Sequence, residues 1–145
     1  MRSSLLIIAA ACLLVGADSP QGNDERLQGT WYIVYANQPG EKGGRESHDF
    51  DDSKFTLTFD HGKVSATGDG KALWQGTYRV DTSRTPATIE ISRRTSLFKR
   101  GVFEVKNDLL KLCLDFPANP WPDRFSVDRN SKAEVTFYKR AKPTP

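Results

Sequence analysis

The feature that most constrains the fold is a series of short segments in which apolar and polar residues alternate, separated by turn-forming residues. In 54–59, Phe55, Leu57 and Phe59 point to one side and two threonines point to the other. The Asp-His-Gly-Lys stretch at 60–63 then has the composition of a tight turn. Outside the N-terminal residues no segment has a helical period. The pattern predicts an all-β chain, an antiparallel up-and-down barrel of about eight strands.

The remaining strands follow from the same alternation and the turns between them. We expect them at 27–36, 64–67, 73–80, 88–92, 101–105, 109–114 and 133–140, with 97–100 either continuing a strand or bending. The charged, glycine-rich stretch 37–52 is predicted to be a loop and, if the barrel has a cavity, its lid. The proline-rich stretch 116–132, which surrounds Trp121, is expected to be irregular.

The N-terminal residues have the pattern of a cleaved secretory signal. A basic start precedes the apolar run from Leu5 to Val15, and small residues follow before Asp18. We expect 1–17 to be removed, 18–26 to be a flexible leader, 27–141 to be the barrel domain and 142–145 to be a disordered tail. The apolar run is too short to span a bilayer, so no stable membrane insertion is expected after cleavage.

Because the chain is predicted to be exported, we expect the mature protein to be periplasmic or extracellular. Lipid anchoring through Cys12 is disfavoured, because apolar residues follow Cys12 where a mature lipoprotein would turn polar. Without Cys12, Cys113 is the remaining thiol, so no intramolecular disulfide is expected and the core has to be held by packing. The net charge of +3 is too balanced to indicate nucleic acid as a partner.

Gly29-Thr30-Trp31 at the head of the first strand resembles the Gly-x-Trp motif of lipocalins. In that family the tryptophan closes one end of the barrel, and a basic residue after the last strand packs on it. The resemblance implies a structural plug made of Gly29, Trp31 and either Lys139 or Arg140. A binding site would then lie at the opposite end, toward Tyr35.

A closer resemblance covers nearly the whole mature chain. The segments 27–31, 76–81, 86–91, 101–114, 122–125 and 135–140 resemble, in order, the motifs of an uncharacterised lipocalin-like family expanded in planctomycete bacteria. This resemblance implies an exported, barrel-like domain without an established activity. The loop 37–52 is too generic to carry over any residue of that family.

No motif in the chain indicates an enzyme, a cofactor or a metal site. Cys113 would need a base such as His48 or His61, and alternation places it opposite the leucine stripe, so we interpret it as a small half-buried residue. The acidic stretch beginning at His48 matches no cation-binding loop and is interpreted as solvated. Arg93, Arg94, Lys99 and Arg100 form a basic patch that we interpret in the same way.

Two functions remain open on these residues. In the first, inward apolar side chains line a cavity for a small apolar or amphipathic ligand in the cell envelope. The predicted cavity walls are Tyr35, Phe55, Leu57, Phe59, Ile89, Ile91, Leu110 and Leu112. In the second, these side chains fill the core, and the protein is a structural or interaction module that docks an envelope protein through its first strand and the Trp121 loop.

Overall fold

The computed structural model describes residues 21–22, 24–50 and 54–142. Within these residues the regular elements are ten strands and one 3-10 helix. They are β1 (Gln21–Gly22), η1 (Glu25–Leu27), β2 (Gly29–Pro39), β3 (Arg45–Asp49), β4 (Phe55–Asp60), β5 (Lys63–Gly68), β6 (Lys71–Asp81), β7 (Ala87–Arg93), β8 (Ser96–Lys106), β9 (Leu109–Asp115) and β10 (Glu134–Arg140). In this part of the chain no helix has the length and apolarity needed to cross a membrane. The predicted signal peptide 1–17 lies outside the described residues.

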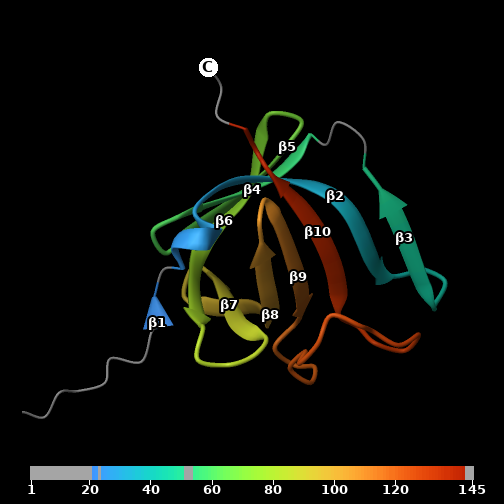
Figure 1. The fold of residues 1–145 in the computed structure, drawn as a ribbon. Helices are drawn as coiled ribbons and strands as arrows, with labels where there is room; N and C mark the ends of the chain where they lie inside the picture. Colours follow the sequence, from blue (N-terminus) through green and yellow to red (C-terminus); the bar gives the residue numbers. More distant parts are fainter. Residues whose placement is uncertain (1–20, 23, 51–53, 143–145) are drawn as a thin grey trace, which may run out of the picture.

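Eight of the described strands close into an antiparallel barrel (Figure 1). Their order around the barrel is β2-β4-β5-β6-β7-β8-β9-β10, and β10 pairs with β2 to complete the circuit. Successive barrel strands are therefore neighbours, as in an up-and-down barrel. The predicted fold class is confirmed. Strand β1 adds to β6, and β3 adds to β2 at the side of the barrel.

The core lies inside one half of the barrel, where alternate side chains of every strand point inward. Trp31, Phe59, Phe103, Ile89 and Leu110 are all less than 2 % exposed. The Phe59 and Tyr78 rings meet edge to face, with their centroids 5.0 Å apart. Aromatic rings thus fill this half of the barrel, whereas alternation alone left open whether they fill a core or line a cavity.

At two positions the local backbone geometry requires a glycine. Gly29 has φ +109°, a conformation that favours glycine and that would strain any other residue at this position. Gly101 lies so close to β9 that a Cβ atom would overlap the Cys113 carbonyl oxygen. Each glycine is followed two residues later by an inward ring, Trp31 or Phe103. At both positions a glycine that the local backbone requires thus precedes a buried ring by two residues.

Two predicted irregular segments are more regular than expected. Within the described part of the predicted loop 37–52, β2 continues to Pro39 and β3 pairs back onto it. The Arg45 side chain stabilises this hairpin by donating to the carbonyls of Asn37, Ser131 and Ala133 at 2.9, 2.9 and 2.7 Å. The predicted flexible leader is also wrong for its described part, because β1 pairs with β6 and Asp24 caps η1. Residues 97–100 continue β8.

The irregular segment 116–132 covers the outer face of the barrel. Beneath it lies a second apolar cluster of Val102, Cys113, Ala133 and Val135, against which Phe125 and two other side chains pack. The Trp121 indole donates to the Gly101 carbonyl at 3.1 Å, and the Arg100 guanidinium lies 4.8 Å from its ring centroid. Irregular backbone is thus held on the sheet by side chains.

Candidate functional site

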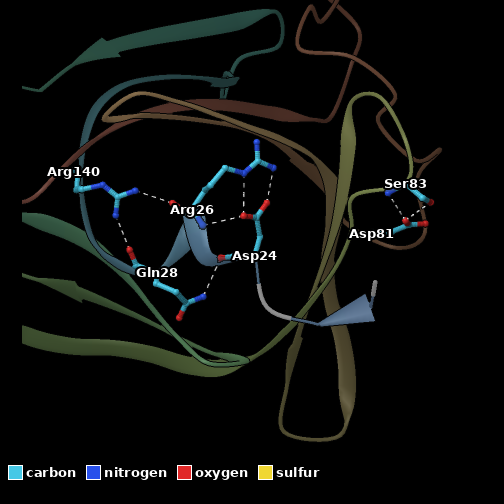
Figure 2. Close-up of polar contacts among 6 residues, drawn as sticks. All are labelled: Asp24, Arg26, Gln28, Asp81, Ser83 and Arg140. Atoms are coloured by element: carbon cyan, nitrogen blue, oxygen red, sulfur yellow. Dashed lines mark hydrogen bonds and ion pairs between the residues drawn. The ribbon is translucent and has the colours of Figure 1, made fainter. Parts of the chain in front are cut away.

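Trp31 plugs the end of the barrel where β2 begins. Its side chain is completely buried, and its indole nitrogen donates to the Leu27 carbonyl at 2.8 Å. The Arg140 guanidinium lies over the ring, 4.2 Å from its centroid, and donates to the carbonyls of Gln28 and Arg26 at 2.6 and 2.7 Å (Figure 2). Lys139 is exposed. Of the two basic residues predicted to pack on the tryptophan, the structure therefore selects Arg140.

Side-chain hydrogen bonds complete this closed end. The Gln28 amide donates to the Tyr78 hydroxyl at 2.8 Å and to the Asp24 carbonyl at 3.1 Å. The Asp24 carboxylate accepts from the backbone and guanidinium of Arg26. Burial alone would raise the pKa of Asp24, but the hydrogen bonds and the charge of Arg26 hold that pKa below its usual value. The closed end is thus fastened by polar contacts around a buried ring.

The opposite end of the barrel contains a cavity of about 430 Å³. Each of the eight barrel strands contributes to its wall. The apolar part of the wall comprises Ile33, Ala36, Phe50, Phe55, Leu57, Ala66, Leu73, Trp74, Ile91, Phe98 and Leu114. The volume lies within the range of small-molecule sites in proteins. The barrel is therefore filled at one end and hollow at the other.

Three of the predicted wall residues line this cavity, namely Phe55, Leu57 and Ile91. Four others lie deeper, in the packed core, and are not part of the cavity wall. These four are Phe59, Ile89, Leu110 and Leu112, each at most 1 % exposed. Their prediction as cavity walls is corrected, because alternation reveals which face a side chain occupies and not its depth along the barrel.

Tyr35 is also not part of the cavity wall, and its prediction as a wall residue is corrected. The pairing of β2 with β10 shifts by one residue between the Ile33–Tyr138 and Tyr35–Phe137 pairs, which makes Val34 the extra residue of a β-bulge. The bulge reverses the alternation, so Ala36 faces the cavity in place of Tyr35. The Tyr35 ring instead packs edge to face on Phe137 at 5.5 Å.

Two further bulges supply wall residues that sequence reasoning missed. The register shifts at Leu73 in β6 and at Phe98 in β8, and both side chains line the cavity. The Phe98 ring meets the Trp74 and Phe116 rings edge to face, at 5.9 and 6.1 Å. A period of two contains no signal for such extra residues. The ambiguity at 97–100, between a continued strand and a bend, was the one local hint.

A polar strip runs along one side of the cavity and was also missed. Glu134, Thr136 and Tyr138 are successive inward residues of β10, and Lys99 of β8 joins them. The Lys99 ammonium lies 3.2 Å from a carboxylate oxygen of Glu134. Burial, and then the negative charge of Glu134, raises the pKa of the Tyr138 hydroxyl, so the hydroxyl stays protonated. The cavity thus combines apolar walls with this strip of charged and hydroxyl groups, and Gln38, Thr56 and Thr67 are further polar residues of the wall.

Cys113 faces outward from the barrel, opposite the leucine stripe as predicted, but it is not half-buried, because the segment 116–132 covers it. Its side chain is completely buried, and burial raises the pKa of its thiol to about 11. Within the described ranges, no group of three or more His, Cys, Asp and Glu side chains could hold a metal ion. Asp51 and Asp52 of the acidic stretch lie outside those ranges.

Comparison with known proteins adds no relatives: no family model, no curated protein and no solved structure matches this chain. The resemblance to a planctomycete lipocalin-like family stays a hypothesis.

Proposed function

We propose that this protein binds a small apolar or amphipathic molecule in the open end of its barrel and catalyses no reaction. The observation that carries the proposal is the cavity of about 430 Å³, opposite the Trp31 plug and lined mainly by apolar side chains. Transfer of an apolar ligand surface from water into such walls is favourable by about 25 cal/mol per Å² of area buried. A closed opposite end would leave one route for the ligand.

The proposal includes the setting of the protein. We take it to be an exported, lipocalin-like domain of the cell envelope, similar to the planctomycete family named above. Support comes from the secretory pattern of the first residues and from the barrel with its Gly29–Trp31 head. Detection of the cleaved chain in the periplasm or medium of an expressing bacterium tests this part. Retention of residues 1–17 in cytoplasmic protein would contradict it.

A binding role is favoured over an enzymatic one by the state of Cys113. A nucleophilic cysteine needs a lowered pKa, whereas burial raises the pKa of this thiol to about 11. The thiol also faces the outer cluster of Val102, Ala133 and Val135, away from the cavity.

The alternative role, as a docking or structural module, fits the structure less well. It assumes a filled barrel, and a cavity lies where that core would be. Its proposed docking residue, Trp121, is tied down by the hydrogen bond to Gly101 and by the stacked Arg100.

The fluorescent probe N-phenylnaphthylamine, which brightens in apolar surroundings, tests the binding role directly. We expect saturable brightening with one probe per chain. Ala66→Phe, which places a ring in the cavity, should weaken binding at least about tenfold, equivalent to about 1.4 kcal/mol. Ala72→Phe is the matched control, because Ala72 lies across the same hairpin but is exposed and outside the cavity wall. Absence of saturable binding, or equal loss in both variants, would refute the proposal.

A further inference from the structure

The cavity has two chemically different sides. Its polar strip follows β10, where Glu134, Thr136 and Tyr138 line the wall in succession. Strand β6 lies diametrically opposite in the barrel order and contributes Leu73 and Trp74. A bound molecule would therefore meet the charged and hydroxyl groups of this strip on one side, and Leu73 and Trp74 on the other.

The charged groups of this wall balance each other. Among the residues that the structure describes, Lys99 and Glu134 are the charged side chains of the wall, and they form an ion pair at 3.2 Å. Their side chains are 21 % and 31 % exposed, so both are largely withdrawn from water. The Phe116 ring, 5.2 Å from the Lys99 ammonium, further holds the lysine in place. Arg93 contacts Phe98 but is exposed and not part of the wall.

The strip offers both donors and acceptors. An ammonium group has three donor hydrogens, and Glu134 occupies one direction of the Lys99 group. The Glu134 carboxylate has several acceptor positions, of which Lys99 uses one. The Tyr138 hydroxyl, which lines the same side of the cavity as Thr136, can both donate and accept a hydrogen bond.

Resting on the binding function proposed above, we propose that the ligand is an uncharged amphiphile. Its head carries a hydroxyl or primary amide that bonds to Lys99 and Glu134, and its apolar body packs toward Trp74. A carboxylate head would approach Lys99 but meet the like charge of Glu134, and an ammonium head would meet Lys99 in the same way. An uncharged head that both donates and accepts satisfies both partners without separating them.

Four compounds with the same ten-carbon chain test this assignment, by displacement of N-phenylnaphthylamine at neutral pH. Decanol and decanamide are uncharged, decanoate is negative and decylamine is positive. We expect the uncharged pair to bind at least about tenfold more tightly than either charged compound. If decanoate or decylamine binds as tightly as decanol, this inference is overturned while the binding function stands. If neither the probe nor any of the four binds, the binding function fails first.

Two variants then reverse the preference. Glu134→Gln leaves the lysine charge unbalanced and should raise the affinity for decanoate relative to decanol about tenfold. Lys99→Met should do the same for decylamine. The matched controls are Glu104→Gln and Lys106→Met, because both residues are exposed on β8 and outside the cavity wall. An unchanged ranking in both cavity variants, or the same change in the controls, would refute the role of the ion pair.

Discussion

The two ends of this barrel are built from the same strands and differ in how those strands finish. At the closed end, Trp31 fills the interior and Arg140 binds the carbonyls of Gln28 and Arg26 over it. At the open end, β-bulges in β2, β6 and β8 redirect side chains, and a cavity remains. One end of the barrel is therefore closely packed and hydrogen-bonded, and the other end encloses a cavity.

The two halves of the barrel differ in the size of their inward side chains. Inward aromatic rings are present in both halves, but the wall of the open half also includes two alanines, Ala36 and Ala66, which leave space between the rings. Native interiors are close-packed, so a cavity of this size forgoes contacts that larger side chains would make. Substitutions at the two ends should accordingly have different consequences for stability and for ligand binding.

The largest effect is expected at the plug. Trp31→Ala should lower the free energy of unfolding by roughly 3–5 kcal/mol, because it removes a completely buried ring and leaves a void. Urea unfolding measures this loss. Trp74→Ala is the matched variant at the open end, where the ring is partly buried. It should cost less stability and weaken probe binding instead. Equal stability losses in the two variants would mean that the ends are not specialised.

Arg140 comes next. Arg140→Met should lower the free energy of unfolding by about 2 kcal/mol, because two charge-assisted hydrogen bonds and the contact with the Trp31 ring are lost. The ion pair with Asp108 adds little, since that carboxylate is 83 % exposed. Lys139→Met is the neighbouring control and should change stability by less than about 0.5 kcal/mol. A larger loss of stability in Lys139→Met than in Arg140→Met would mean that Lys139, and not Arg140, stabilises the closed end.

A pair of substitutions on β5 compares the two interiors directly. Val64 is 1 % exposed in the packed core, and Ala66, two residues along the same face, lines the cavity. Val64→Phe should cost about 1–3 kcal/mol through overpacking, whereas Ala66→Phe should cost less because room for the ring exists. Urea unfolding of both variants gives the comparison. A greater cost for Ala66→Phe would show that the cavity does not accept a ring.

Much of the fold follows from the sequence, because alternation and turn residues are local properties. The Phe55, Leu57 and Phe59 face, the 60–63 turn and the closed barrel were all predictable on that basis. The strand β3 was not predictable from alternation, because its polar and charged residues form no apolar face. It is held by backbone pairing with β2 and by Arg45 reaching residues far along the chain.

The site was less predictable than the fold, for two physical reasons. Alternation does not report depth, so Phe59 and Leu57 look equivalent, although both are buried and Leu57 alone of the two lines the cavity. A bulge, moreover, reverses the face of every residue beyond it, which moved Tyr35 outward and Ala36 inward. Lys99 in β8 and Glu134 in β10 form an ion pair between strands that are not neighbours. No short-range sequence pattern could therefore predict it.

The smallest expected effect concerns Asp24, and its pH dependence sets the polar fastening of the closed end apart from the packing of the ring. Asp24→Asn should cost about 1 kcal/mol at neutral pH, because the carboxylate caps η1 and binds Arg26. The folded-state pKa lies below the usual 3.8, so this contribution is fully present above pH 3.8 and is lost as the pH falls further. Urea unfolding of both proteins, at neutral pH and well below pH 3.8, should therefore show the difference shrinking. Asp123→Asn, at a carboxylate that is 88 % exposed, should have no measurable effect at either pH. A difference that persists undiminished in acid would mean that Asp24 acts through its shape and not through its charge.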